Sequence, residues 1–277
     1  MALKSIFKQT GVYWKKNFRL FLNQKDWKFI IIAAVISFLV CGIVGEDMFE
    51  TYESTKSGFF AIISAAIWIG IFNSIQSICK EHSTITSECR SGLHMSSYIL
   101  AHVFFDFFVC LIQSIALIVI CSVFIDFPED GIIFGKSIIE YFITLLLIVW
   151  SSDIMGIMIS SVASNPNVAM TAMPFVLILQ LVMSGVLFEL SGWSEKVAYI
   201  TFSKWGMSAL GSIGNLNSDE LPLKMSLVFP QVVRLETEAA YESTTENLLT
   251  AWGCIMLIGL VCVLISIISL KIRNKDS

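Results

Sequence analysis

Charged residues are scarce in this chain: they make up 14% of its 277 residues, while 56% are hydrophobic and the mean hydropathy is +0.77. Globular domains carry roughly 25% charged residues, so an ordinary soluble domain is excluded. Proline is also scarce, with 5 in the whole chain. Because a bilayer core requires about 20 apolar residues per helix, the composition predicts an all-α membrane protein.

Catalytic and metal-binding motifs are missing as well. The sequence contains no G-x-x-x-x-G-K-[ST] loop, no H-E-x-x-H, no C-x-x-C and no G-x-S-x-G. The 7 cysteines lie in predicted spans or in a polar turn, so no disulfide framework is indicated. We therefore predict no catalytic residue, no metal site and no cofactor bound by this chain, and we expect neither enzymatic activity nor a nucleic-acid partner.

Six apolar runs predict six membrane spans. They cover about 27–45, 58–79, 97–125, 136–162, 168–189 and 248–270. The basic, amphipathic segment 1–26 precedes them and predicts a helix lying at the cytoplasmic membrane surface. Span five is followed by a long acidic segment, 190–247, whose aromatic residues favour short helices at the outer interface.

Lysine and arginine are distributed unevenly, and this distribution predicts the orientation. Of the 18 such residues, the outer segments would hold Lys56, Lys136, Lys196, Lys204, Lys224 and Arg234. The remaining two thirds would lie in the shorter inner segments, as the positive-inside rule requires. Both termini are therefore expected in the cytoplasm, and the segment 190–247 is expected outside the cell.

A polar stretch, 73–106, separates spans two and three. Its middle part predicts a surface helix that would end at Ser91-Gly92. Its two ends predict a polar core between the spans, consisting of Asn73 and Gln76 on span two and His102 and Asp106 on span three, where Gln113 shares the face. His102 lies one turn from Asp106 and could pair with it, because ionisable groups inside spans face protein or water.

Span four contains two acidic residues, Glu140 and Asp153, whose positions the sequence does not fix. Asp153 either joins the polar core or extends toward the membrane surface, and Glu140 is expected at the interface. Two functions stay open from these residues. One is an ion-coupled carrier or channel using His102 and Asp106, and the other is a membrane assembly protein.

The polar stretch resembles the G subfamily of ATP-binding-cassette transporters, the White and pleiotropic-drug-resistance type. The residues that carry the resemblance are Glu81, Glu88, Ser91, Gly92, Ser96, Ser97, Tyr98 and Asp106. Ser184-Gly185-Val186-Leu187 resembles the S-G-L-L motif of that family, with the smaller valine at the first leucine. The order of a basic helix, six spans and a long outer segment agrees with the same family.

This resemblance implies a type-2 exporter permease that works as a homo- or heterodimer with two ATPase domains in the cell membrane. The helix between spans two and three would be the coupling helix that contacts the ATPase, with roles for Glu81, Glu88, Arg90 and Gly92. Spans two and five of both protomers would line the substrate path. The path and its plug would include Ile69, Phe72, Ile178, Leu181, Val186 and Leu187.

The whole chain, 1–277, is thus expected to be one transmembrane permease domain. In that family the ATPase domain normally precedes the spans, and no residue precedes Met1 here. ATP and Mg²⁺ are therefore expected on a partner ATPase, or on a domain that has been removed from this chain. The outer segment lacks the cysteines and the glycan acceptor of animal members, which favours a bacterial source. An apolar path suits lipophilic or amphipathic substrates moved outward by alternating access.

Overall fold

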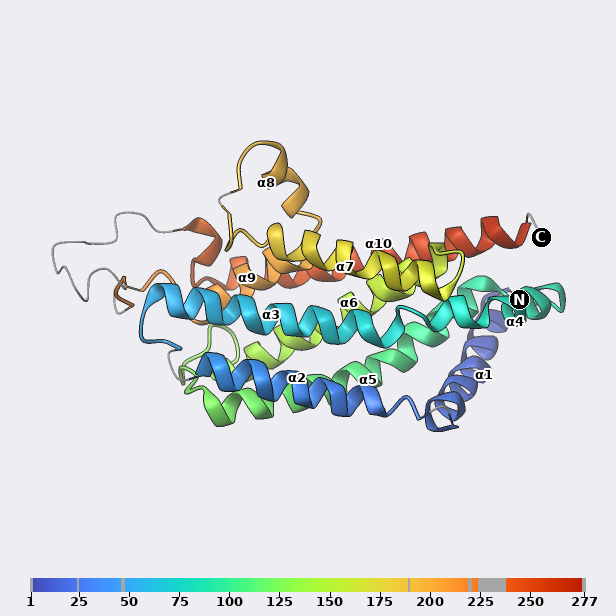
Figure 1. Cartoon of the computed structure of the whole chain (residues 1–277), viewed down its shortest axis with the longest axis horizontal. Helices are drawn as coiled ribbons and strands as arrows, with labels where there is room; N and C mark the ends of the chain where they lie inside the picture. The colour runs from blue at the N-terminus through green and yellow to red at the C-terminus, as the bar shows by residue number, and fades with distance from the viewer. Residues whose placement is uncertain are drawn as a thin grey trace.

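The structure is a computed structural model that describes residues 2–23, 25–45, 48–188, 190–218, 221–223 and 238–275. Within these ranges all the regular structure is helical. The long helices run side by side along one axis, as Figure 1 shows. The helices are α1 (Ala2–Asn23), α2 (Lys28–Val44), α3 (Tyr52–Ser74), α4 (Ser77–Arg90), α5 (Met95–Phe124), α6 (Ser137–Val162), α7 (Pro166–Val182), α8 (Trp193–Ala198), α9 (Phe202–Ile213), the 3₁₀ helix η3 (Ala239–Tyr241) and α10 (Thr245–Lys275).

Helices occupy all six positions predicted as spans, but only part of that layout meets the requirements for crossing a bilayer. Four segments are long and apolar enough by themselves: Tyr52–His82, Met95–Phe124, Ser137–Val162 and Thr245–Arg273. The segments Phe7–Asn23 and Lys28–Val44 together would make a fifth, broken by a bend of 70°. The helix α7 is apolar but has only 17 residues, and a straight helix of that length extends about 25 Å.

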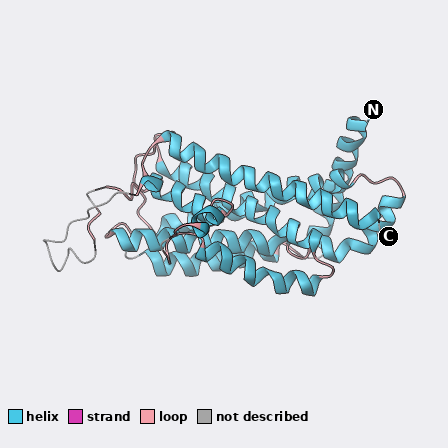
Figure 2. Ribbon diagram, turned by 90° about the horizontal axis from the view of Figure 1, so that it is seen from above, coloured by secondary structure: helices cyan, strands magenta, loops and turns pink. Residues whose placement is uncertain are grey.

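The two ends of the bundle differ in what they carry. The start of α1, the helix α4 and the end of α10 lie together at one end, which we call the termini end (Figure 1). The segment around η3 lies at the other, which we call the loop end, and α8 projects from the side of the bundle near α7 and α9. In the view turned by 90°, α1 projects from the termini end at a steep angle to the bundle (Figure 2).

The centre of the bundle is the packing of α3 against α6, with α10, α5 and α9 around this pair. Two glycines allow the close approach. A Cβ on Gly70 would clash with the backbone oxygen of Val149, and a Cβ on Gly156 would clash with Oγ of Ser74. Small residues at such crossings let helix backbones meet without a side chain between them.

The segment after α7 differs from the expectation of interfacial helices. Short helices are present, and Trp193 is 73% exposed, but α9 is buried among α3, α6 and α10, and Phe202 is fully buried. Gln180 of α7 fixes the start of α9, because its Oε1 accepts hydrogen bonds from the backbone N–H groups of Phe202 and Ser203 at 2.9 and 3.2 Å. The rest of the predicted outer segment falls partly on residues 219–220 and 224–237, which lie outside the described ranges.

Candidate coupling site and polar core

The helix predicted between spans two and three is present as α4, and it ends as the sequence indicates. Gly92 has φ +100°, a conformation that glycine adopts without strain. The N–H of Leu93 donates to the carbonyl of Glu88 at 3.1 Å, and the N–H of Gly92 donates to that of Cys89 at 3.0 Å. This pair of bonds is a Schellman motif, which satisfies the last carbonyls of the helix and turns the chain into α5.

The acidic residues of α4 bind the basic helix α1. Nζ of Lys16 lies 3.5 Å from a carboxylate oxygen of Glu81 and 3.5 Å from one of Glu88. The hydroxyl of Tyr13 donates to Glu88 at 2.7 Å, and the hydroxyl of Tyr98 in α5 donates to Glu81 at 3.0 Å. We call these five side chains the α1 clamp, because they join α1, α4 and α5 at the termini end.

Backbone groups of the turn after α4 extend the same attachment. Gln9 of α1 donates from Nε2 to the carbonyl of Gly92 at 3.1 Å and accepts from the N–H of His94 at 3.1 Å. The side chain of Arg90 and the backbone of Gly92 are exposed beside this contact. Glu81 and Glu88 therefore face α1, whereas Arg90 and Gly92 lie on the surface, where another domain could reach them.

The polar core contains one pair of reciprocal hydrogen bonds. Nδ2 of Asn73 in α3 donates to Oε1 of Gln113 in α5 at 2.8 Å, and Nε2 of Gln113 donates to Oδ1 of Asn73 at 3.0 Å. Nε2 of Gln113 also donates to the carbonyl of Phe29 in α2 at 3.3 Å. These bonds join three helices inside the bundle, where a polar group without a partner is costly.

His102 and Asp106 share a face of α5 as predicted, but no hydrogen bond or ion pair joins them in the part of the chain that the structure describes. His102 is 7% exposed, and its ring packs edge-on against Tyr98 with the centroids 4.8 Å apart. Its Nε2 is buried without a hydrogen-bond partner. The described residues also contain no group of three His, Cys, Asp or Glu that could hold a metal ion.

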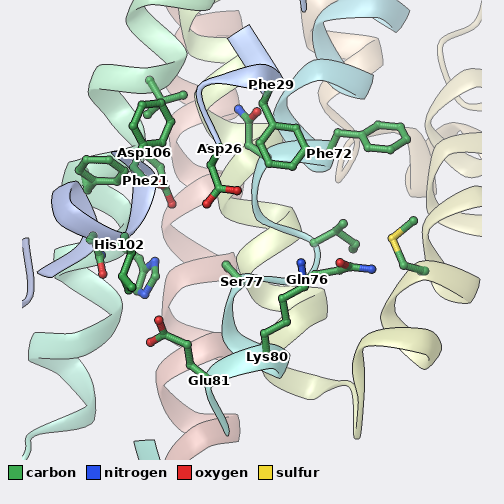
Figure 3. Close-up of a pocket in the computed structure, with 17 residues that line it drawn as sticks. Phe21, Asp26, Phe29, Phe72, Gln76, Ser77, Lys80, Glu81, His102 and Asp106 are labelled. Atoms are coloured by element: carbon green, nitrogen blue, oxygen red, sulfur yellow. The ribbon is translucent and has the colours of Figure 1, made fainter. Parts of the chain in front are cut away.

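Both residues instead line a cavity of about 360 Å³ at the termini end. Figure 3 shows that side chains from several helices converge on it. Its polar lining consists of Asn17, Asp26, Asn73, Gln76, Ser77, Lys80, Glu81, His102 and Asp106. It lies where two helix breaks meet, the bend between α1 and α2 and the junction of α3 with α4.

Asp26 lies at the first of these breaks, outside the helices. Burial raises the pKa of its carboxyl above the usual value, and the positive charge of Lys80 opposes this rise. In Figure 3 the two side chains point into the same cavity from opposite walls. Within the described ranges they form no direct ion pair, so both charges stay available to a third group in the cavity.

The start of α4 is held by a residue that the sequence did not single out for this role. The Oγ of Ser160 in α6 accepts hydrogen bonds from the N–H groups of Ile78 and Cys79, both at 3.1 Å. The Sγ of Cys79 donates to the carbonyl of Ser160 at 2.8 Å. Such a cap satisfies N–H groups of the first helical turn. In the sequence, this cap is indicated only by the presence of a serine, Ser160, within an apolar span.

Asp153 and Glu140 are both buried inside the protein. Asp153 is fully buried in α6, its carboxylate oxygens lack a hydrogen-bond partner among the described residues, and its backbone carbonyl accepts from Ser74 Oγ at 2.5 Å. Glu140 is also fully buried. Its carboxylate accepts backbone N–H bonds from Ile132, Ile133 and Phe134 at 2.9, 2.5 and 3.0 Å. The loop before α6 therefore folds over Glu140, whose carboxylate binds this loop instead of extending to the surface.

The residues expected on a substrate path have different surroundings. On α3, Ile69 is 3% exposed and packs in the core, whereas Phe72 is half-buried and lines the cavity. On α7 and the segment after it, Ile178 and Leu187 are 57% and 52% exposed, and Leu181 and Val186 are half-buried. The path and plug roles of these side chains stay predictions.

The turn that carries the S-G-V-L sequence is ordered by its serine. Gly185 has φ +78°, and the hydroxyl of Ser184 accepts from the N–H of Val186 at 3.2 Å while it donates to the carbonyl of Leu181 at 2.8 Å. These bonds end α7 and direct the following chain back across the bundle toward α8 and α9. The turn therefore fixes the position of Val186 and Leu187 at the end of α7.

The fold and the site together define a multi-span helical membrane protein with a surface helix attached to its spans. Residues 8–213 match the ABC-2 type transporter family, and the chain belongs to this family. It is a membrane permease component of the ABC transporter class. One similar protein is the ABC transporter ATP-binding/permease protein Rv1747 of Mycobacterium tuberculosis, with 22% identity over 221 residues. The matching region covers 75% of this chain and 25% of that relative.

Proposed function

We propose that this chain is the permease subunit of an ATP-driven exporter, which moves a lipophilic or amphipathic substrate out across the cell membrane. In this proposal six helices cross the bilayer, with α1 at the interface and both termini in the cytoplasm. Two such protomers associate with ATPase subunits on separate chains. The relative from Mycobacterium tuberculosis is named as an ATP-binding/permease protein. This name supports the proposal that the present permease works with an ATPase.

The observation that carries the proposal is the α1 clamp at the termini end. Lys16 bridges Glu81 and Glu88, so α1 and α4 form one charged unit attached to α5. A domain that presses on the exposed end of α4, at Arg90 and Gly92, moves this unit rather than one isolated helix. The clamp thus gives an external ATPase a rigid point of contact with the spans.

Movement of α4 has two direct routes into the bundle. Its first turn is bonded to Ser160 of α6, and a short break joins it to α3. The close approach at Gly70 and Gly156 makes α3 and α6 move together, because packed helices do not deform continuously. ATP binding by the partner would then shift the equilibrium between inward- and outward-open arrangements of the spans.

The substrate path is proposed between protomers, along α7 and α3. The face of α7 with Phe175, Ile178 and Leu179 is exposed, and Trp68 on α3 is 40% exposed. An apolar face of this kind suits a lipophilic substrate and a second protomer. Ile69 lies inside the protomer in this arrangement, so its contribution would be to the packing behind the path.

The proposal is tested by co-expressing the chain with a candidate ATPase encoded beside it and purifying the complex. We expect co-purification and ATP hydrolysis that rises when the permease is present. Arg90→Glu should lower this stimulation several-fold, because Arg90 lies at the exposed end of α4. Lys136→Glu reverses an exposed charge at the other side of the bundle and serves as the matched control. Equal stimulation for both variants and the wild type would refute the contact.

A further inference from the structure

The cavity at the termini end has unsatisfied polar groups that no part of the coupling proposal uses. Asn17 of α1 is 4% exposed, lines the cavity, and has neither its Nδ2 nor its Oδ1 hydrogen-bonded in the described structure. Nε2 of His102 faces the same space and is likewise without a partner. A buried amide with no partner costs about 1–3 kcal/mol. The arrangement therefore indicates that something else in the cavity forms these bonds.

The charged side chains around the cavity favour a ligand that has both a positive and a negative group. Glu81 is already engaged by Lys16 and Tyr98, which leaves the carboxylates of Asp26 and Asp106 on one side and the ammonium of Lys80 on the other. No ion pair joins these three groups among the described residues. A ligand with an ammonium group for the carboxylates and an anionic group for Lys80 would satisfy the whole set.

Size and geometry narrow the class of ligand. A metal ion is disfavoured, because the described residues include no group of three His, Cys, Asp or Glu that could hold one. The cavity volume of about 360 Å³ is far larger than a single ion or water molecule requires, so the cavity can hold a polar group of several non-hydrogen atoms. An ethanolamine phosphate is a polar group of this kind, and its primary ammonium has three N–H donors.

The walls of the cavity favour a lipid over a free metabolite. Beside the polar groups the lining contains Leu20, Phe21, Phe29, Phe72, Phe105, Val109 and Met170. The bend between α1 and α2 places the cavity at one end of the bundle, at the depth where the headgroups of one leaflet would lie. A lipid could place its headgroup among the charges and leave its acyl chains against the apolar side chains.

We propose that this cavity is a headgroup site for an aminophospholipid of the phosphatidylethanolamine class. Asp26 and Asp106 would bind the ammonium group, Lys80 the phosphate, and Asn17 and His102 the ester and phosphate oxygens. A bound headgroup would contact α1, the turn between α1 and α2, α4 and α5 at once. The lipid would therefore stabilise the bend between α1 and α2 beside the α1 clamp.

The test uses the full chain purified in mild detergent, delipidated and titrated with phosphatidylethanolamine, phosphatidylglycerol or phosphatidylcholine of identical acyl chains. Native mass spectrometry measures the bound lipid. We expect phosphatidylethanolamine to bind at least tenfold more tightly than the other two, because phosphatidylglycerol lacks the ammonium group and choline has no N–H donor. Equal binding of all three lipids would overturn the proposal.

Substitutions in the cavity lining test whether the lipid binds in this cavity. Asp26→Asn and Lys80→Met should each weaken phosphatidylethanolamine binding by roughly tenfold to a hundredfold, the effect of one lost charge-assisted hydrogen bond. The controls Glu129→Gln and Lys28→Met change exposed residues outside the cavity lining and should bind like the wild type. Asp26 lies half-buried at a bend, so its replacement should fold. Unchanged binding in both cavity variants would refute the site.

A soluble competitor separates the two sources of the headgroup chemistry. Glycerophosphoethanolamine has the same ammonium and phosphate groups but no acyl chains. We expect millimolar concentrations of it to leave the bound lipid in place, because the apolar walls favour the chains. Displacement at concentrations comparable with the lipid would show that the cavity takes a free zwitterion, and the lipid assignment would then be wrong.

Discussion

The side-chain amides of Asn73 and Gln113 exchange two hydrogen bonds, at 2.8 and 3.0 Å, between α3 and α5. Gln113 is 1% exposed, so water does not readily replace either bond. Single replacement by an apolar residue leaves the other amide buried with unsatisfied groups. Replacing both amides leaves no unsatisfied amide group in the bundle. The pair therefore predicts a non-additive pattern of stability.

We expect Asn73→Leu and Gln113→Leu each to lower the free energy of unfolding by about 1–3 kcal/mol. The double variant should be destabilised by less than the sum of the two, because no orphaned amide remains. Tryptophan fluorescence during thermal unfolding in detergent measures all three proteins. Additive losses would show that the two side chains act independently.

The glycine contact between α3 and α6 gives a second prediction. Gly156→Ala places a Cβ in a clash with Ser74 Oγ and 2.9 Å from the carbonyl oxygen of Ile71, so the helices must separate. We expect a destabilisation of about 1–3 kcal/mol, typical of overpacking. Gly253→Ala in α10 is the control, since nothing lies within 4 Å of its Cβ. That control should be neutral or slightly stabilising, because alanine favours helices.

The buried carboxylate of Glu140 gives a third prediction. Its three backbone hydrogen bonds to Ile132, Ile133 and Phe134 hold the loop between α5 and α6. Glu140→Ala should lower the free energy of unfolding by about 3 kcal/mol and expose this loop to limited proteolysis, because hydrogen bonds to charged groups are strong. Glu129→Ala changes an exposed acid in the same loop and should leave the cleavage rate unchanged. Equal cleavage of both variants would contradict this role.

The start of α9 gives a fourth prediction. Gln180 accepts from the N–H groups of Phe202 and Ser203 inside the bundle. Gln180→Leu should destabilise the protein by about 1–3 kcal/mol, because both donors would stay buried without an acceptor. Gln180→Glu keeps the acceptor oxygens and should keep more of the hydrogen bonding. A thermal melt of the two variants separates loss of acceptors from loss of packing.

Local signals in the sequence were sufficient for much of the architecture. The S-G pair after Arg90 predicted the end of α4, because only glycine readily takes φ +100° in a Schellman motif. The predicted start of span two was six residues late, since Thr51 and Ser54 form a capping box that begins α3 at Tyr52. Length and apolar composition could not decide how many helices cross the bilayer, because α7 is short and α1 bends into α2.

Tertiary partners explain what the sequence could not show. The cap from Ser160 to α4 and the amide of Gln180 at α9 join residues more than 20 positions apart, and no spacing rule connects them. The polar core between spans two and three was predicted with Asn73 and Gln113 on its facing helices, and these two side chains do bond. The pairing of His102 with Asp106, which was left open, is absent among the described residues. The cavity site could not be predicted either. Asn17 lines the cavity with an unpaired amide only because α1 packs against the other helices there.

The central claim is that the α1 clamp transmits the action of the partner ATPase through α4. A charge-swap series tests it most directly, with ATP hydrolysis measured for ATPase and permease reconstituted together in liposomes. Lys16→Glu places three carboxylates together, and Glu88→Lys sets two ammonium groups side by side, so each should reduce permease-stimulated hydrolysis at least fivefold. The double variant restores one attractive pair and should recover more than half of the stimulation. Single variants that retain full stimulation, or a double variant no better than either single one, would contradict the claim.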